Sequence, residues 1–167
     1  MSEIREIVTK AVIAKGRKIF RLKQVIPLEN DIEKILGCWI LNHETNCVLN
    51  DNTVKINGKF ENDVWYLFNN ETNIVKAETT YDDVIKLREL NCECVNDNKE
   101  ICTRIINEPC CTNACIKDGT VELEIVFELV VEIIGETKIM VNVFDCIDNF
   151  DPVDDFENEI NEDFLND

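Results

Sequence analysis

The strongest constraint on the fold is an alternation of apolar and charged residues toward the C-terminal end of the chain. In residues 121–133 every odd position is apolar, and carboxylates occupy most of the even positions (Val121, Leu123, Ile125, Phe127, Leu129, Val131 and Ile133 against Glu122, Glu124, Glu128 and Glu132). Successive side chains of a β-strand point to opposite faces of its sheet. The segment therefore predicts a long strand with one apolar face and one mostly carboxylate face.

Further strands are predicted on both sides of this segment. Gly135-Glu136-Thr137 is a turn candidate, and the alternation resumes in residues 139–143, so a C-terminal hairpin is predicted. Weaker strand signals occupy residues 38–41, 53–60, 64–68, 74–81 and 84–87. Asn and Asp pairs are expected to form the turns between such runs, since their side chains stabilise turn conformations (Asn62-Asp63, Asn69-Asn70 and Asp82-Asp83).

Only one helix is predicted, and it is short. Asn30 would cap it, Glu33 completes a capping box, and three apolar residues share one face (Ile32, Ile35 and Leu36). The first 25 residues fit a helical or a strand pattern, but Gly16 disfavours a helix interior, so a strand is preferred from about residue 8 to residue 25. The predicted fold class is all-β, an antiparallel β-sandwich or jelly-roll-like domain.

The predicted organisation is a β-sandwich scaffold domain over residues 1–147 and an acidic, partly disordered tail over residues 148–167. The net charge of −17 is uneven: residues 1–23 are mainly basic, whereas no Lys or Arg follows Lys138. This polarity favours head-to-tail self-association, and equally fits a solubilising tail and a solvated strand. No signal peptide, membrane span or nucleic-acid footprint is expected, so the protein is expected to be made and kept inside its cell.

Nine cysteines are present, and six lie between residues 92 and 115 (Cys92, Cys94, Cys102, Cys110, Cys111 and Cys115). No C-x2-C pair exists, so a zinc site is disfavoured, and a metal-stabilised binding module is kept as the alternative. A cysteine nucleophile would need His43, the only histidine, for which a structural role at a strand end is preferred. Cys38 and Cys146 are expected to be small buried hydrophobes. The six clustered thiols lie among polar residues and are predicted to be accessible for cross-linking.

Several blocks of the sequence resemble the outer spore-coat morphogenetic protein CotE family. In order they are residues 5–12 (REIVTKAV), 14–18 (AKGRK), 35–40 (ILGCWI), 42–43 (NH), 64–66 (VWY), 83–88 (DVIKLR) and 135–138 (GETK), followed by an acidic end around Phe164-Leu165. The resemblance spans nearly the whole chain. It does not include the cysteines from Cys92 to Cys115, and the tail is short for the family.

The resemblance implies a non-enzymatic scaffold that is made in the mother-cell cytoplasm and becomes part of the spore coat. The residues themselves predict no cofactor and no metal ligand. It implies a homo-oligomer that binds other coat proteins, including the basement-layer protein. The N-terminal segment would serve oligomerisation, with Arg5, Lys10, Lys15, Arg17 and Lys18 as candidate residues. The acidic tail would bind partner proteins, with Phe156, Ile160, Phe164 and Leu165 as candidates.

Overall fold

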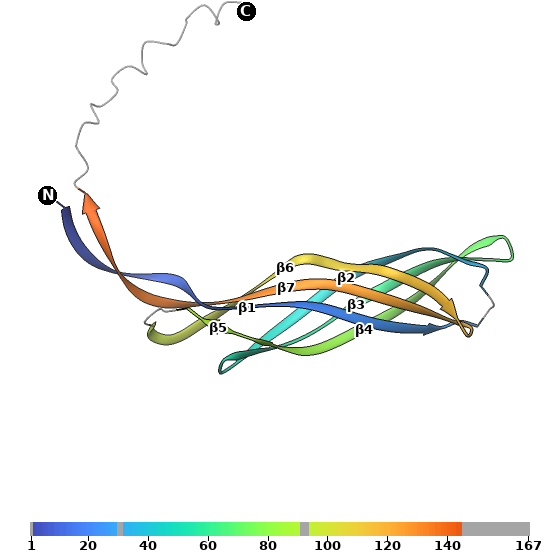
Figure 1. Cartoon of the computed structure of the whole chain (residues 1–167), viewed down its shortest axis with the longest axis horizontal. Coiled ribbons are helices and arrows are strands. Elements are labelled where there is room, and N and C mark those ends of the chain that lie inside the picture. Colours follow the sequence, from blue (N-terminus) through green and yellow to red (C-terminus); the bar gives the residue numbers. More distant parts are fainter. Residues whose placement is uncertain (1, 30–31, 91–93, 145–167) are drawn as a thin grey trace, which may run out of the picture. The chain divides into compact units, whose positions relative to one another are not determined.

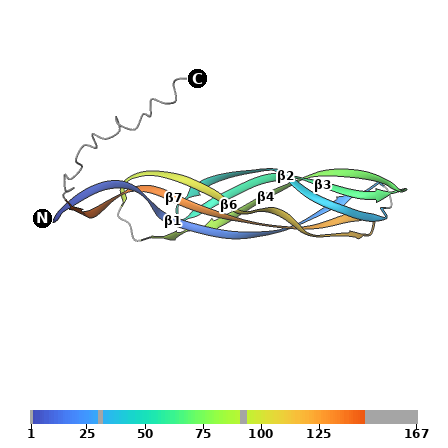
Figure 2. The same ribbon diagram turned by 90° about the horizontal axis from the view of Figure 1, so that it is seen from above.

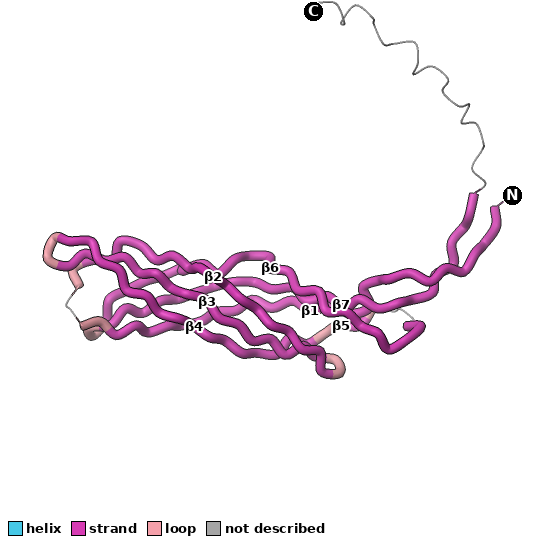
Figure 3. Tube along the Cα trace, turned by 180° about the vertical axis from the view of Figure 1, so that it is seen from behind, coloured by secondary structure: helices cyan, strands magenta, loops and turns pink. Residues whose placement is uncertain are grey.

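The computed structural model describes residues 2–29, 32–90 and 94–144. Seven β-strands account for nearly all of them: β1 (Ser2–Pro27), β2 (Lys34–Asn50), β3 (Thr53–Phe68), β4 (Glu71–Lys86), β5 (Arg88–Glu89), β6 (Cys94–Lys117) and β7 (Thr120–Phe144). Figure 3 shows strands and loops, and no helix, over this described part of the chain. The predicted all-β fold class is therefore confirmed.

The strands form two sheets, in the orders β5-β1-β7-β6 and β2-β3-β4 (Figure 1). Consecutive antiparallel hairpins build the three-stranded sheet and also join β6 to β7. The tight turns have positive φ angles, 51° and 61° at Asn69-Asn70 and 50° and 73° at Asp118-Gly119. Asn, Asp and Gly tolerate this left-handed conformation, which suits two-residue hairpin turns. The turn predicted at Asn69-Asn70 is thus confirmed.

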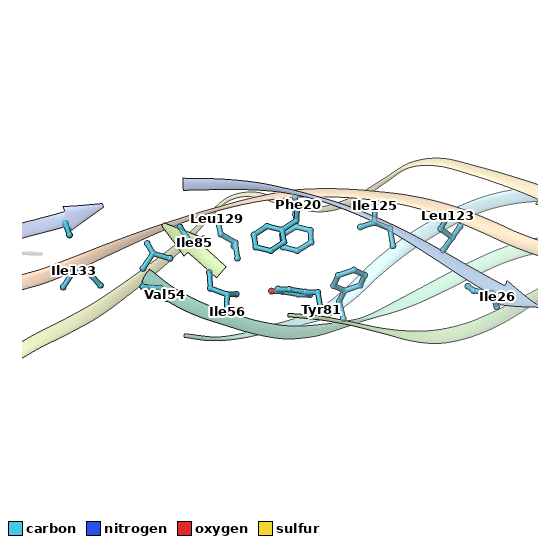
Figure 4. Packing of buried hydrophobic residues seen from close by; sticks show 14 of the residues in the cluster. Phe20, Ile26, Val54, Ile56, Tyr81, Ile85, Leu123, Ile125, Leu129 and Ile133 are labelled. Atoms are coloured by element: carbon cyan, nitrogen blue, oxygen red, sulfur yellow. The ribbon is translucent and has the colours of Figure 1, made fainter. Parts of the chain in front are cut away.

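The described chain divides into two compact units, and the larger one, Val8–Lys138, contains the core. The strands of its two sheets cross in Figure 2, and their facing sides supply the buried side chains drawn in Figure 4. The odd positions of β7 from Val121 to Ile133 are all buried, as the alternation predicted. Phe127 stacks on Phe20 at 4.6 Å between ring centroids and lies 4.9 Å from Tyr81 of the opposite sheet. These rings hold the two sheets together.

The second unit comprises Met1–Ile7 and Ile139–Asp167. Its described residues are the first part of β1 and the last part of β7, and its apolar side chains are largely exposed (Ile4, Ile7, Ile139, Met140 and Phe144). Arg5 pairs with Glu3 at 2.8 Å within this unit. The boundary predicted after residue 147, the acidic tail and Cys146 lie outside the described residues.

The predicted short helix is wrong. Ile35 and Leu36 lie in β2, and Ile32 and Glu33 lead into that strand, whereas Asn30 is outside the described residues. The backbone N–H of Glu33 already donates to the carbonyl of Leu67 at 2.9 Å, and Ile35 pairs with Tyr66 of β3. The Glu33 carboxylate accepts a hydrogen bond from the backbone N–H of Asn69 instead of closing a capping box. Pairing with β3 therefore outweighs the local helix signal.

The hairpin predicted at residues 135–137 is also wrong, because β7 continues through them. Gly135 is paired with Lys99 of β6, and a Cβ atom there would lie 2.8 Å from Cδ1 of Ile13. The glycine thus permits close packing of β1 against β7 rather than a turn. The strand predicted for residues 8–25 is confirmed within β1.

Two other predicted turns lie inside strands. Asn62-Asp63 belongs to β3 and Asp82-Asp83 to β4. Asn62 is buried and donates its side-chain N–H to Oγ1 of Thr79 at 2.7 Å. Asp63 accepts from Lys76 at 3.0 Å. These partners on the neighbouring strand β4 make Asn62 and Asp63 compatible with a continuous β3, although the buried Oδ1 atom of each has no hydrogen-bond partner among the described residues.

Candidate functional site

The basic residues of β1 lie beside carboxylates of β7. Positions 15 and 17 of β1 point away from the core, because the alternating positions Ala14 and Gly16 are buried. Lys15 pairs with Glu132 at 2.9 Å, and Arg17 donates its Nε–H to Glu128. Farther along, Lys23 lies 3.6 Å from Glu124. The carboxylate face that the alternation predicted for β7 is therefore matched, strand to strand, by cations of β1.

The other predicted oligomerisation residues are also ion-paired within the chain. Lys10 pairs with Glu100 of β6. Lys18 points toward the opposite sheet, where its ammonium lies 2.6 Å from Asp83 of β4 and 5.7 Å from the centroid of the Phe20 ring. Each of the five predicted cations thus has a carboxylate partner in the structure. These ion pairs lie within one chain, so the role of the five residues in oligomerisation stays a prediction.

These ion pairs keep the carboxylates ionised. The hydrogen bond from Arg17 lowers the pKa of Glu128 below its ordinary value, with a smaller contribution from Asn107. The hydrogen bond from Lys15 and the charge of Arg104 lower the pKa of Glu132 in the same way. The outer face of this sheet is therefore a network of opposite charges, and its net field is much weaker than the basic N-terminal sequence suggests.

The clustered cysteines lie on β6 and are divided between its two faces. Cys102, Cys110 and Cys115 are paired with Glu132, Val126 and Glu122, on the face that carries the charge network. Cys111 is paired with Ile125, which is fully buried, so its thiol points toward the opposite sheet. Cys94 is exposed and pairs with Thr137, whereas Cys92 lies outside the described residues. The described members of the predicted group therefore do not lie on one face of β6.

The inward-pointing Cys111 shares a surface pocket with Cys38 of β2, which sequence reasoning assigned to the core. The Cys111 thiol itself donates a hydrogen bond to the carbonyl of Asn113 at 3.2 Å. Burial, with a smaller contribution from the neighbouring cysteine, raises the pKa of Cys38 to about 12, and burial also raises the pKa of Cys111. Cys47, also on β2, accepts a hydrogen bond from Oγ1 of Thr103 on β6 at 3.1 Å. The alternation of β2 could have placed Cys38 inward, but its partner depends on how the sheets are arranged.

The single histidine lies at a β-bulge in β2 rather than at a strand end. The pairing with β3 shifts between Leu41 and Glu44, and Asn42 has a positive φ of 54°. His43 Nε2 lies 2.7 Å from the hydroxyl of Tyr81, and its ring packs against Phe60 and Phe127. Burial lowers the pKa of His43, so the ring is neutral at pH 7. These contacts agree with the structural role expected of this residue.

The part of the chain that the structure describes contains no set of side chains that could bind a metal ion. There, no group of three or more His, Cys, Asp and Glu side chains is placed to hold an ion. The same residues contain no helix long and apolar enough to cross a membrane.

An exposed aromatic surface lies on the outer face of the three-stranded sheet. Trp39 of β2 and Trp65 of β3 meet edge to face at 6.2 Å and are 53% and 38% exposed. Ile74 of β4 lies directly opposite Trp65 and is also exposed. Trp65 lies in the strand predicted over residues 64–68, and the buried Val64 and Tyr66 on either side place it on the opposite face from the core. Apolar surface of this kind is typical of interaction sites.

The described residues thus present a network of paired charges and an exposed aromatic surface. The model of one protein family, outer spore coat protein E (CotE), matches residues 3–167. The chain belongs to the CotE family. Membership assigns it to the proteins of the outer spore coat. Comparison with curated proteins and with solved structures gave no match.

Proposed function

We propose that this protein is a non-enzymatic morphogenetic scaffold of the endospore outer coat that self-assembles and recruits other coat proteins. The observation that carries the proposal is the CotE family match across residues 3–167, which includes the whole strand framework and the acidic end. Its site of action would be the mother-cell cytoplasm first and the spore coat afterwards.

Unpaired strand edges support self-association with a second copy of the chain. Within the described residues β5 covers β1 only at Ala14 and Lys15, so residues 16–27 of β1 have no strand partner on that edge. The outer edges of β2, β4 and β6 also end their sheets. Unpaired N–H and C=O groups on such edges can accept a strand from another molecule.

Exposed apolar side chains support the same proposal. Met140 and Phe144 of β7 are 65% and 75% exposed, and Ile4 of β1 is 62% exposed. The Trp39–Trp65 pair adds a second apolar surface on the larger unit. Burying such groups between copies would contribute favourable free energy, because transfer of apolar area out of water is the main source of association energy.

The division of roles along the chain remains part of the proposal. Residues 1–25 would serve oligomerisation, and residues 148–167 would bind coat proteins, among them the protein of the basement layer. The alternation of carboxylates with Phe156, Ile160, Phe164 and Leu165 suits a segment that orders on a partner. The polarity of charge between the two ends would steer this docking at low salt.

Light scattering on the full chain tests self-assembly. We expect the particle mass to rise with protein concentration in reducing buffer, since strand edges and apolar surfaces need no disulfide. A monomer at every concentration, with and without reductant, would refute the proposal.

A matched pair of charge variants tests the N-terminal segment. The triple variant Lys15→Glu, Arg17→Glu and Lys18→Glu also breaks ion pairs with Glu132, Glu128 and Asp83, so it loses stability and assembly together. Arg21→Glu reverses an exposed charge on the same strand that has no ion pair among the described residues. We expect Arg21→Glu to weaken assembly at an unchanged melting temperature. Unchanged particle mass would remove this face of β1 from the oligomerisation surface.

A further inference from the structure

Two edge strands from different sheets lie close together on one side of the larger unit. β2 is the outer strand of one sheet, β6 is the outer strand of the other, and the two are in contact. No backbone pairing joins them among the described residues, because β2 pairs with β3 and β6 pairs with β7. This edge of the sandwich is therefore held only by side chains, among them Cys47 and Thr103.

Two thiols meet at this edge. Cys38 lies opposite Val64, which is fully buried, and Cys111 lies opposite the fully buried Ile125, so both side chains point between the sheets. Both residues are half-buried and line one shallow surface pocket of about 290 Å³ together with Gly37 and Ala114, where β2 and β6 are in contact. The Cys111 thiol donates a hydrogen bond to the carbonyl of Asn113 at 3.2 Å, within its own strand. A small reagent can therefore reach both thiols in the same pocket.

We propose that Cys38 and Cys111 form an intramolecular disulfide that joins the two sheets when the protein meets an oxidant. The geometric requirement is that the two sulfurs approach without backbone movement, and two inward-pointing side chains that line one pocket from contacting edge strands are placed to meet it. The sequence places these cysteines 73 positions apart, so the bond closes a long loop and restricts the unfolded chain strongly. The proposal does not depend on the proposed scaffold function.

The chemistry requires a two-electron oxidant, which a low-molecular-weight disulfide can supply. The Cys111 thiol loses a proton to solvent, and its thiolate attacks one sulfur of the small disulfide. The old S–S bond breaks, a small thiolate leaves and takes up a proton, and a mixed disulfide remains on Cys111. Cys38 then loses its proton and attacks the Cys111 sulfur, and the second small thiol leaves. Two protein thiols are thereby oxidised to one disulfide, and the small disulfide is reduced to two thiols.

Burial makes the pair slow to react at neutral pH, since only the thiolate is nucleophilic. The raised pKa values of Cys38 and Cys111 keep both largely protonated, which suits thiols that persist in a reducing cell. Cys110 is exposed on the other face of β6 and is the natural competitor for the oxidant. Its outward direction removes it from the Cys38 thiol, so it is expected to link to other chains or to remain free.

The test is disulfide mapping of the full-length protein. Protein purified in reductant is transferred to oxidised glutathione at about pH 8.5, where the thiolate fraction is larger. Remaining thiols are alkylated, and the monomer band of a non-reducing gel is digested for mass spectrometry. We expect a peptide pair linked through Cys38 and Cys111, and a melting temperature about 10 °C higher than that of the reduced protein. The rate of linkage should rise roughly tenfold per pH unit between pH 7 and pH 8.

Variants separate this disulfide from other thiol chemistry. Cys110→Ser should keep the Cys38–Cys111 link and the rise in melting temperature, whereas Cys111→Ser should lose both. The map of the unmodified protein does not depend on how the variants fold. A Cys38 that is fully alkylated in the oxidised monomer, or that is linked to Cys110 instead, would overturn the proposal.

Discussion

Replacing Phe127 by alanine tests how the two sheets are held together. Phe127 is fully buried in β7, and its ring centroid lies 4.6 Å from Phe20, 4.9 Å from Tyr81, 5.3 Å from His43 and 6.1 Å from Phe60. Truncation removes a ring that has aromatic neighbours from both sheets, so the surrounding structure cannot collapse onto the space without moving a sheet. Substitutions of this kind cost about 3–5 kcal/mol, and the rigid surroundings favour a value of about 4 kcal/mol.

A loss of this size is a large part of the free energy of unfolding, which is about 5–15 kcal/mol for most domains. The assay is urea unfolding in reducing buffer, followed by the fluorescence of Trp39 and Trp65, which lie on a different face from the substitution. Phe144→Ala is the matched control, because it removes the same atoms from a side chain that is 75% exposed. It should change stability by no more than about 0.5 kcal/mol.

A double-mutant cycle with Phe20→Ala measures the stacked pair itself. The rings are nearly parallel, with 3° between their planes, and such pairs contribute about 1 kcal/mol beyond their buried area. If Phe127→Ala cost no more than Phe144→Ala, the argument that these rings join the sheets would be refuted.

Three further predictions concern charge and close packing. Because burial lowers the pKa of His43, the unfolded chain takes up a proton at a higher pH than the folded chain does. The stability that depends on neutral His43 is therefore present above about pH 6.5 and falls as the pH drops toward 5. The melting temperature of His43→Gln should fall less over this range, and the same dependence of melting temperature on pH in both proteins would contradict this. Glu132→Gln leaves Lys15 and Arg104 without their carboxylate, so its melting temperature should be lowered more in low salt than in about 1 M salt; a salt-independent loss would contradict an ionic cause. Gly16→Ala should lower the free energy of unfolding in urea by about 1–3 kcal/mol, since its Cβ would meet the Lys86 carbonyl oxygen at 2.8 Å. Gly135→Ala should lower it less, because the added Cβ meets the flexible Ile13 side chain. The reverse order would show that the backbone at Gly16 can move.

Period-two alternation predicted the class of fold and the inward face of β7 because that pattern reports burial directly. It could not predict where the strands end, because a turn is predicted from a few adjacent residues without their contacts in the folded sheet. Asn62 and Asp83 resemble turn residues in sequence, yet their side chains have partners on the adjacent strand (Thr79) and in the opposite sheet (Lys18), and these contacts exist only once the sheets are formed. Gly135 shows the same limit, since a side chain there would collide with Ile13, which is more than a hundred positions away in the sequence.

The candidate site was predicted less well than the fold, for a related physical reason. The basic N-terminal segment and the carboxylates of residues 122–132 were both recognised, but their mutual neutralisation depends on the order β1-β7 in one sheet. The pairing of Cys38 with Cys111 depends in turn on which edge strands face each other. Residue chemistry can be read along the chain, whereas neighbours across a sandwich follow from topology.

The bulges of β6 determine which thiols point between the sheets and which point to the outer face. The pairing of β6 with β7 shifts between Ile105 and Asn107, again before Cys110, and once more after Cys111. Each irregularity changes which residues point between the sheets, because side chains alternate strictly along a strand. Loss or gain of one residue in this stretch would exchange the directions of Cys110 and Cys111. A thiol suited to closing the protein's own fold would then become one suited to joining neighbouring molecules, with no cysteine added or removed.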